Sequence, residues 1–481
     1  MAYIAAFDAG TTAVKGTLVN EAGEAVLSCS AELTTLVREG FQDQEPGDWW
    51  AAFCAISRQF TETVPPADIT GVIMSGQMQD LIPLDRALEP VCPAILYCDG
   101  RASEQAAALE QVVGAEFFLH TTGNRCDGSL PLPKLMWLRE QRPDLYARTA
   151  HILISSKDYL VARLTGVCAG DVTACATAGA MDIRRKCWNQ RLLSAAGADP
   201  ALFPKLYQPH QQVGVVLPAA ERECGLRVGT AVFAGIGDAG ATTLASGIRA
   251  PGQYNINLGT SGWVAAVSES ILLTETGVFN LAAAAEDCYI NVVPFLNAGN
   301  VHKWMAGVLG RTGGAPDYET VSALLSASVP GSHGVLCLPY LCGERFPVLD
   351  ADIRGCWFGL SPETTAADLA RSCLEGVAFS LLQGLERLAD TPVSVSLIGG
   401  GGQEPVWCQL LADVLGHAIT VLPDTQFRAA QALASLVRPE RSVGTVRAEH
   451  ETVYLPRQEY RGLYDGLYAR YRQLYPALRG L

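Results

Sequence analysis

One short turn near the start of the chain combines residue types that suit phosphate binding. Asp8 is followed by Gly10, Thr11 and Thr12, between two apolar runs. Glycine lets the backbone approach an anion, and the turn N–H groups and threonine hydroxyls can hold phosphate oxygens without a lysine. Asp8 at the strand end suits Mg²⁺ held through water, because this ion prefers oxygen ligands. An ordinary Asp-x-Gly hairpin turn is the alternative interpretation.

This turn has a counterpart in the second half of the chain. Phe7–Thr12 aligns by eye with Ile256–Ser261, which contains Gly259 and Thr260, at a spacing of 249 residues from Phe7 to Ile256. A spacing of half the chain indicates two halves built on one plan, not a solenoid repeat. In the first copy, Lys15 adds a positive charge to the strand that returns from the turn.

A run of four glycines, Gly399–Gly402, directly follows a predicted strand at 391–398. Glycine loses more conformational freedom on folding than other residues, so such a run indicates backbone that lies close to a ligand. Gln403 then opens a predicted helix. A flexible surface turn is the alternative.

Two familiar nucleotide-binding motifs are not favoured. A Walker A loop needs a Gly-Lys dipeptide, which the sequence lacks. Gly235–Gly240 matches G-x-G-x-x-G, but a dinucleotide fold also needs an acidic residue at the end of the next strand. That strand, 254–258, carries asparagines and leads into the repeated hairpin.

The elements around these motifs alternate between strands and helices. We predict strands at 3–7, 14–19, 25–28, 69–74, 230–234, 254–258 and 391–398, and helices at 105–113, 135–141, 241–246, 368–388 and 460–478. In the helix at 368–388, apolar residues recur at every fourth position, as in an amphipathic helix. Such alternation is typical of α/β domains. The repeat places the domain boundary near residue 245.

Composition and charge exclude several functional classes. The chain has 481 residues, with 35 Lys+Arg against 49 Asp+Glu and a formal net charge of −14. This acidic balance argues against binding to nucleic acid or to an anionic membrane through bulk charge. No stretch reaches the roughly 18–20 apolar residues that cross a bilayer. The 15 dispersed cysteines lack zinc-site spacing, which favours a reducing, cytoplasmic location.

Taken in order, these motifs resemble those of the actin-like ATPase superfamily and, within it, the FGGY carbohydrate kinases, especially the bacterial xylulokinases. Further resembling segments are 40–50, 75–78, 93–101, 156–160, 237–238, 338–345 and 355–360. The resemblance implies two actin-like (ribonuclease H-like) α/β domains that flank a central cleft. They would be an N-terminal sugar-binding domain, 1–245, and a C-terminal ATP-binding domain, 246–481. The implied reaction is the ATP-dependent phosphorylation of D-xylulose to D-xylulose 5-phosphate, with Mg²⁺.

The resemblance also implies a role for each matching residue. Asp238 would be the general base that takes the proton from the attacking sugar hydroxyl, whereas an aspartate that merely caps a helix is the alternative. The sugar would contact Asp238, Met78, Gln79 and Tyr97. The phosphates would be held by Thr11, Thr12, Lys15, Gly259 and Thr260, and the adenosine side by Gly299, Lys303, Gly400, Gly401 and Gln403. Asp8 would hold the metal.

Three positions depart from the xylulokinase pattern. Those kinases usually read Gly-Gln-Met-His-Gly where this chain has Gln79 and Asp80 at the last two positions. Glutamine donates and accepts hydrogen bonds but cannot carry a proton as histidine does. Tyr97 replaces a tryptophan, so the identity of the sugar stays open. Gln431 replaces a glycine near the adenosine side, so the close approach that glycine allows is lost there.

Two alternatives to xylulose phosphorylation stay open. The first is an FGGY kinase for another ketose or a polyol, and the second is a non-catalytic, nucleotide-gated binding module. Retention of Asp238 favours catalysis. The expected ligands are ATP or ADP and a small sugar, a ketopentose first, and neither nucleic acid nor a membrane is expected. A homodimer is compatible with the sequence.

Overall fold

The computed structural model forms two compact units. It describes residues 2–38, 41–273, 277–311, 315–388, 392–423, 427–438 and 451–479. Unit 1 comprises Met1–Ala245, Asn280–Tyr289 and Thr425–Val446, and unit 2 comprises Ser246–Phe279, Ile290–Asp424 and Arg447–Leu481. Two short segments from the second half of the sequence therefore belong to unit 1. Among the described residues, no helix is long and apolar enough to cross a membrane.

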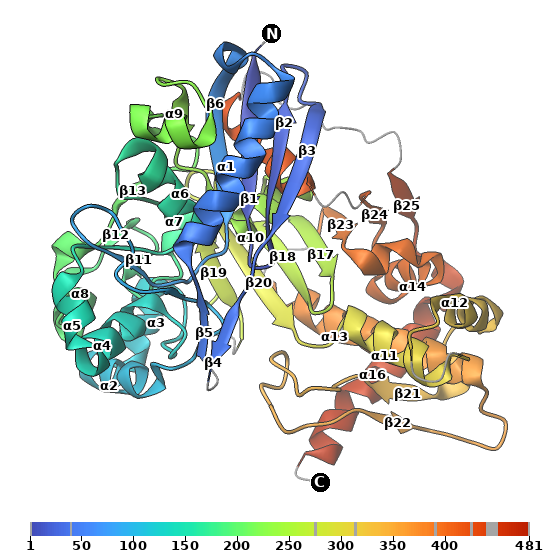
Figure 1. Cartoon of the computed structure of the whole chain (residues 1–481). Helices are drawn as coiled ribbons and strands as arrows, with labels where there is room; N and C mark the ends of the chain where they lie inside the picture. Colours follow the sequence, from blue (N-terminus) through green and yellow to red (C-terminus); the bar gives the residue numbers. More distant parts are fainter. Residues whose placement is uncertain are drawn as a thin grey trace. The chain divides into compact units, whose positions relative to one another are not determined.

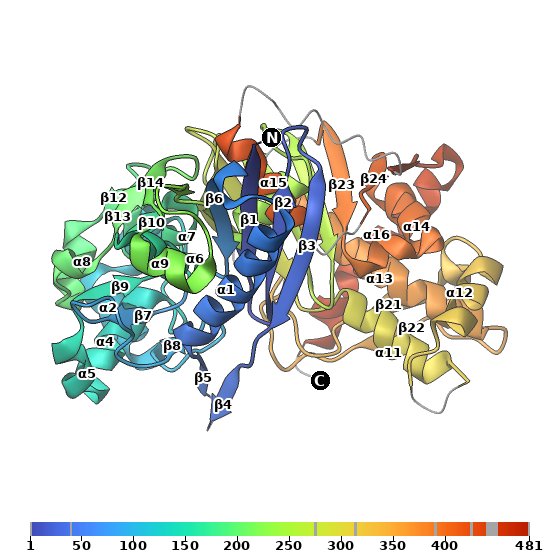
Figure 2. The same ribbon diagram turned by 45° about the horizontal axis from the view of Figure 1, so that its top comes forward.

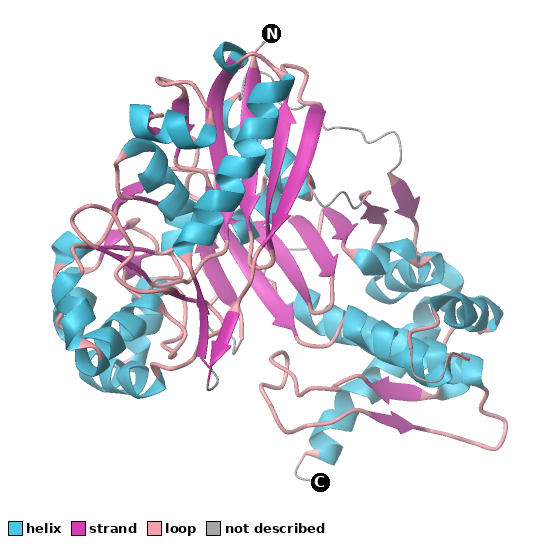
Figure 3. Cartoon of the chain, in the orientation of Figure 1, coloured by secondary structure: helices cyan, strands magenta, loops and turns pink. Residues whose placement is uncertain are grey.

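Unit 1 is built on a sheet in the order β14-β15-β6-β1-β2-β3, with β16 also paired to β6. The strands are β1 (Tyr3–Ala9), β2 (Ala13–Val19), β3 (Ala25–Glu32), β6 (Ile69–Gly76), β14 (Gln212–Val215), β15 (Ala231–Phe233) and β16 (Ile236–Gly237). β1 is antiparallel to β2 and parallel to β6, and β15 and β16 are parallel to β6. Since β1, β6 and β16 run in one direction, their carboxyl ends lie at one edge of this sheet. β1 and β6 are labelled in Figure 1, and Figure 3 shows the strands of the sheet in magenta.

Helices cover both faces of this sheet. On one face lies α1 (Pro46–Thr63), whose Phe53 ring centroid is 4.4 Å from that of Phe7 on β1 (Figure 2). On the other face, α10 (Asp238–Ala245) and α15 (Arg428–Val437) pack against strand residues such as Ile4 and Ile73. Burial on both faces explains why these strands read as nearly continuous apolar runs.

Helix α15 joins unit 1 through polar contacts as well. The side-chain Nε2 of Gln431 donates to the backbone carbonyl of Gly23 at 2.9 Å. Arg438 donates to the carbonyls of Asn20 and Ala2, both at 3.0 Å. The glutamine that replaces the family glycine thus contacts the loop after β2.

Further elements of unit 1 lie around this sheet. The strands are β4 (Leu36–Arg38), β5 (Phe41–Gln44), β7 (Ile82–Leu84), β8 (Ala94–Ile95), β9 (His151–Leu153), β10 (Ala169–Asp171), β11 (Met181–Asp182), β12 (Cys187–Trp188) and β13 (Lys205–Tyr207). The helices are α2 (Ser103–Val113), α3 (Ala115–Thr122), α4 (Pro131–Gln141), α5 (Pro143–Arg148), α6 (Ser156–Thr165), α7 (Val172–Cys175), α8 (Gln190–Ala196) and α9 (Pro218–Cys224).

The second sheet repeats the topology of the first. Its order is β19-β20-β18-β17-β23-β24-β25, with β17 antiparallel to β18 and parallel to β23, and β24 parallel to β23. The strands are β17 (Gln253–Leu258), β18 (Gly262–Ser268), β19 (Phe279–Ala282), β20 (Tyr289–Phe295), β23 (Ser394–Ile398), β24 (Ile419–Val421) and β25 (Thr452–Tyr454). β17, β18 and β23 therefore correspond to β1, β2 and β6. The predicted repeat of two halves on one plan is confirmed.

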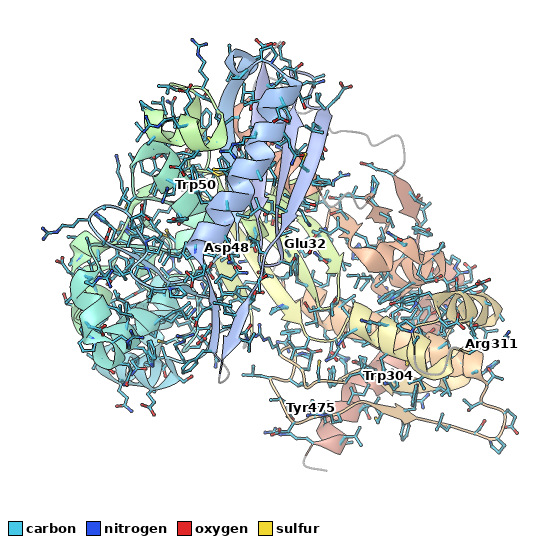
Figure 4. All side chains as sticks on the ribbon, viewed as in Figure 1. Glu32, Asp48, Trp50, Trp304, Arg311 and Tyr475 are labelled. Atoms are coloured by element: carbon cyan, nitrogen blue, oxygen red, sulfur yellow. The ribbon has the colours of Figure 1, made fainter. Side chains whose placement is uncertain are left out.

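A long helix forms the centre of unit 2. α13 (Ala366–Arg387) begins with a capping box between Thr365 and Asp368 and is buried along most of its length. Around it lie α11 (Gly299–Leu309), α12 (Tyr318–Ala327), β21 (Leu336–Leu338), β22 (Cys356–Phe358), α14 (Pro405–Leu415) and α16 (Arg461–Leu478). Trp304 on α11, labelled in Figure 4, lies over Trp357 with ring centroids 5.6 Å apart.

Candidate active site

Unit 1 brings two carboxylates to one edge of its sheet. Asp8 on β1 is the register partner of Ser75 on β6, and Gly237 on β16 is the partner of Gly76. Asp238 follows Gly237 directly as the first residue of α10. The predicted metal ligand and the predicted base therefore both lie at the carboxyl edge, where ligands bind in open α/β sheets.

Asp8 lies beside the cation of the same hairpin. It pairs across the strands with Lys15 and accepts a hydrogen bond from the Ser75 hydroxyl at 2.7 Å. Burial raises the pKa of the Asp8 carboxyl, while the Ser75 hydrogen bond and the Lys15 charge lower it. A phosphate or a cation at this edge would thus meet one acid and one ammonium group.

The turn between β1 and β2 is short and partly exposed. The N–H of Gly10 donates to the carbonyl of Ala13 at 3.1 Å, which closes the turn. The hydroxyl of Thr11 donates to the Gln77 side chain at 2.7 Å, whereas Thr12 is exposed. Thr11 is therefore held in place and Thr12 is accessible to a ligand.

Asp238 has the acidity that a general base needs near neutral pH. Burial raises the pKa of its carboxyl to about 7, and the negative charges of Asp8 and Asp171 act in the same direction. A hydrogen bond from the N–H of Ala239, 2.7 Å long, opposes the shift. A base works best when its pKa lies near the working pH.

The glycines around Asp238 have a packing role. A Cβ on Gly237 would collide with the sulfur of Met78, and a Cβ on Gly235, whose φ is +71°, would collide with the carbonyl of Met74. The G-x-G-x-x-G match thus lets this segment pass close to β6 and its turn. It also places Met78 directly against the residue before the base.

The amide of Gln79 has a defined orientation. Its Nε2 donates to the Ser129 hydroxyl at 2.5 Å, and Ser129 in turn donates its only proton to Asp127 at 2.5 Å. Since Ser129 must accept from Gln79, the nitrogen of the amide faces the serine. The carbonyl Oε1 of Gln79 is then the free end, and no described residue binds it. A sugar hydroxyl that reaches Gln79 would donate to this oxygen.

Tyr97 is coupled to the same turn. Its backbone N–H donates to Oδ1 of Asp80 at 3.0 Å, while 43% of the residue is exposed. Burial raises the pKa of the Tyr97 phenol, and a hydrogen bond with Thr11 lowers it. The structure therefore brings Met78, Gln79 and Tyr97 together with Asp238 at one edge of unit 1.

A buried ion triad that the sequence motifs did not predict lies beside the base. Lys157 lies 2.5 Å from Asp158 and 2.8 Å from Asp171, and all three side chains are buried. Asp171 also accepts from the N–H groups of Thr173 and Ala174 at the start of α7. The Asp-x-Thr pattern is a capping signal in the sequence, but its approach to Asp238 arises from tertiary packing.

In unit 2, the second hairpin turn lies against the start of α11. The N–H of Gly299 donates to the carbonyl of Gly259 at 2.8 Å, and Asn300 donates to the carbonyl of Thr260 at 2.9 Å. A Cβ on Gly299 would collide with the Gly259 carbonyl. Three of the predicted nucleotide residues, Gly259, Thr260 and Gly299, are thereby brought together.

The four glycines after β23 do not share one role. Gly399 has φ +94° and ψ 169°, and a Cβ there would lie 2.6 Å from the carbonyl of Leu258. A Cβ on Gly401 would lie 2.7 Å from the Leu258 side chain. Around Gly400, no described atom lies within 4 Å of such a Cβ. Packing against β17 thus requires two of these glycines, and Gly400 leaves its backbone exposed to a ligand.

The two remaining predicted adenosine residues are exposed. Gln403 ends the short helix over Gly400–Gln403, and Lys303 lies one turn after Gly299 on α11. Both side chains are thus accessible in unit 2.

The donor set of unit 1 fits a magnesium ion that keeps most of its water. No group of three or more His, Cys, Asp or Glu residues able to hold a metal occurs in the described part of the chain. Mg²⁺ bound with phosphates needs only one or two protein carboxylates. Asp8, at the strand end beside the phosphate turn, meets that requirement.

Comparison with known proteins agrees with this architecture. The family model for the N-terminal domain of the FGGY family of carbohydrate kinases matches residues 3–245, and that for its C-terminal domain matches 254–430. The xylulose kinase of Escherichia coli (strain K12) is 30% identical over 485 residues, which cover 98% of both chains.

Solved structures give the same result. The xylulose kinase from Rhodospirillum rubrum superposes with a TM-score of 0.91 at 25% identity and covers 99% of both chains. The gluconate kinase from Lactobacillus acidophilus reaches 0.90 at 25% identity and covers 99% of this chain and 98% of its own. The predicted fold class is confirmed.

Proposed function

The chain belongs to the FGGY family of carbohydrate kinases and is an ATP-dependent phosphotransferase, and we propose that its acceptor is D-xylulose. Similarity to a xylulose kinase at 30% identity along 98% of both chains supports this substrate. In the reaction, the terminal sugar hydroxyl attacks the γ-phosphorus, and the bond from that phosphorus to the bridging oxygen breaks. The products are D-xylulose 5-phosphate and ADP.

Asp238 is the general base in this proposal. The single observation that carries the mechanism is a carboxylate at the carboxyl edge of the unit 1 sheet with a pKa of about 7. Its carboxylate would take the proton of the attacking hydroxyl as the new oxygen–phosphorus bond forms. Gly237 on its N-terminal side lets Met78, one of the proposed sugar residues, pack directly against the segment that carries this carboxylate.

Met78, Gln79 and Tyr97 would bind the sugar. The Gln79 carbonyl, oriented by Ser129, would accept a hydrogen bond from one sugar hydroxyl. The partly exposed ring of Tyr97 would cover an apolar face of the sugar. These contacts would orient the attacking hydroxyl toward Asp238, and orientation is a major part of catalysis by kinases.

The residues that we propose for ATP are described for each unit separately. Thr11, Thr12 and Lys15 of unit 1, with Gly259 and Thr260 of unit 2, would bind phosphate oxygens through N–H groups, hydroxyls and one ammonium. The adenosine side would lie against Gly299, Lys303, Gly400, Gly401 and Gln403. Asp8 would hold Mg²⁺ through water, and that ion would supply neutralisation of the phosphate charge. The assignment of sugar binding to 1–245 and ATP binding to 246–481 belongs to the same proposal.

A panel of acceptors tests the substrate. ADP release is measured with D-xylulose, other pentuloses, hexuloses, polyols and D-gluconate at equal concentrations. We expect the highest kcat/KM with D-xylulose. A flat response to D-xylulose together with turnover of another acceptor would overturn the substrate and leave the kinase assignment intact.

A kinase for another acceptor is the second candidate. Gln79 and Tyr97 stand where xylulokinases usually have histidine and tryptophan, and a gluconate kinase has a closely similar fold. In Gln79→His, a sugar preference that stays unchanged would show that this residue does not discriminate between acceptors. A purely nucleotide-gated binding module is set aside, because the chain is a member of a kinase family.

A further inference from the structure

A buried acid and a buried base contact the backbone of the proposed sugar residues and have no part in the mechanism above. Asp80 and Lys134 are both completely buried, at 0% exposure. Asp80 ends the turn after β6, and Lys134 lies in the first turn of α4. Charged groups are rarely buried unless they are paired, so this pair needs a reason.

Lys134 holds two backbone segments at once. Its ammonium donates to the carbonyl of Gln79 at 3.1 Å and to the carbonyl of Leu96 at 2.7 Å. Leu96 directly precedes Tyr97 in the chain. One side chain therefore links the backbone of both proposed sugar residues to α4.

Asp80 also links the turn after β6 to the segment that contains Tyr97. Its Oδ1 accepts from the N–H of Tyr97 at 3.0 Å, and its own N–H donates to the carbonyl of Ile154 at 3.0 Å. Its Oδ2 is buried and has no hydrogen-bond partner among the described residues. Burial raises the pKa of the Asp80 carboxyl well above its usual value and lowers the pKa of the Lys134 ammonium to about 8, while the charge of each group opposes the shift of the other.

The backbone of Gln79 explains why such support is needed. Gln79 has φ +67°, in the left-handed region that residues other than glycine rarely adopt. Strained residues of this kind persist only where their surroundings hold them, and they concentrate at functional sites. The Lys134 hydrogen bond acts on the carbonyl of this strained residue.

We propose that Asp80 and Lys134 are positioning residues for the sugar acceptor. They would hold Gln79 in its left-handed conformation and Tyr97 at a fixed distance from it, so that both side chains meet the sugar in one geometry. This inference rests on the proposed function for the identity of the sugar residues. It adds two residues that touch neither sugar nor nucleotide and still set acceptor affinity.

Steady-state kinetics of Lys134→Met, Asp80→Asn and the double variant test the proposal. Methionine keeps the volume of the lysine stem, and asparagine keeps an acceptor for the Tyr97 N–H. In Lys134→Met we expect the acceptor KM to rise at least about tenfold, because two charge-assisted hydrogen bonds are lost. The KM for ATP should stay within about twofold, since the nucleotide residues are untouched.

The double variant separates positioning from stability. Replacing both charges removes the unpaired charge that each single variant buries, so the melting temperature should recover. The acceptor KM should stay raised, because the hydrogen bonds to Gln79 and Leu96 are still missing. Recovery of the acceptor KM together with stability would overturn the proposal, as would equal changes in the KM of ATP and of the acceptor.

Glu375→Gln is the matched control. Glu375 and Arg371 form a buried pair in unit 2, with the guanidinium 2.8 Å from the carboxylate. Loss of this charge pair in Glu375→Gln should lower the melting temperature and leave the acceptor KM unchanged.

A crystal structure of Lys134→Met gives a result that does not depend on activity. We expect Gln79 to leave the left-handed region and Tyr97 to shift. An unchanged positive φ at Gln79 with Tyr97 in place would overturn the inference. If the wild-type protein phosphorylates no sugar, the proposed function fails, and the structural result still decides this inference.

Discussion

The hairpins of the two units occupy the same place in their sheets and differ in charge. β1–β2 lies beside the parallel strand β6, and β17–β18 lies beside the parallel strand β23. In the first hairpin Asp8 faces Lys15, whereas in the second Asn257 faces Trp263. One backbone frame therefore carries a charged pair in unit 1 and a neutral pair in unit 2.

The turns that follow β6 and β23 also differ in how many side chains they supply. β6 leads into 76–80, where Met78, Gln79 and Asp80 supply side chains, and β23 leads into Gly399–Gly402, which supply backbone only. Side chains can discriminate between sugars, while exposed backbone suits a nucleotide common to many enzymes. The fold thus supplies the edge of each sheet, and the side chains at that edge set its chemistry.

Among changes to the two hairpins and the turns beside them, making the first hairpin neutral should have the largest effect. In Asp8→Asn we expect kcat to fall by about 100-fold or more, because the carboxylate for Mg²⁺ is lost. The variant should fold normally, since asparagine can still accept from Ser75. The acid limb of kcat/KM should also move to lower pH, because the Asp8 charge raises the pKa of Asp238. The measurement is kcat and kcat/KM from pH 5 to 9.

Asp48→Asn, a change at an exposed acid on α1 labelled in Figure 4, is the control and should be silent. Wild-type turnover in Asp8→Asn would contradict the metal role of this carboxylate.

The glycine turn offers a matched pair of variants. Gly399→Ala should destabilise the protein by about 2 kcal/mol or more. Its positive φ is a backbone conformation that essentially only glycine adopts, and the new Cβ would collide with the carbonyl of Leu258. Gly400→Ala meets no described atom and should keep the wild-type melting temperature. Thermal unfolding measures both. Equal melting temperatures would show that packing against β17 does not require Gly399.

Adding a negative charge to the second hairpin would give it the carboxylate that the first hairpin has. In Asn257→Asp we expect the Kd for ATP to rise about tenfold, because a carboxylate would repel the phosphates. Asn257→Ala separates loss of the amide from the added charge. Isothermal titration with ATP measures both, and an unchanged Kd in Asn257→Asp would place the phosphates away from this hairpin.

The smallest effect should come from the residue that orients Gln79. Ser129→Ala frees the amide to flip, so the acceptor KM should rise about threefold to tenfold with little change in the KM of ATP. Ser194→Ala, at an exposed serine on α8, is the control. An unchanged acceptor KM in Ser129→Ala would mean that the amide orientation does not affect sugar binding.

Local patterns predicted the central strands of both sheets and several of the helices. The helix predicted at 368–388 is α13 (Ala366–Arg387), and the one predicted at 460–478 is α16 (Arg461–Leu478). The helix predicted at 241–246 begins earlier, at Asp238, because the helix starts directly after β16. Periodicity and turn residues are local signals, so they identify such elements without knowledge of the partners.

Contacts between residues far apart in the chain could not be predicted from the sequence. The membership of α15 in unit 1 depends on contacts such as Gln431 with Gly23, more than 400 residues apart in the chain. The orientation of the Gln79 amide depends on Ser129, and the acidity of Asp238 depends on Asp8 and Asp171. None of these partners lies at a fixed distance along the sequence from the residue it contacts, so no sequence motif predicts the contact.

The base assigned to Asp238 is the central claim, and Asp238→Asn tests it most directly. In the wild-type protein kcat/KM should rise with pH to a plateau above about 7, because the base must lose its proton before it acts. In the variant, kcat should fall by about 10²–10⁴-fold, while ATP binds with its wild-type Kd. Turnover near the wild-type rate, with the same pH profile, would contradict the claim.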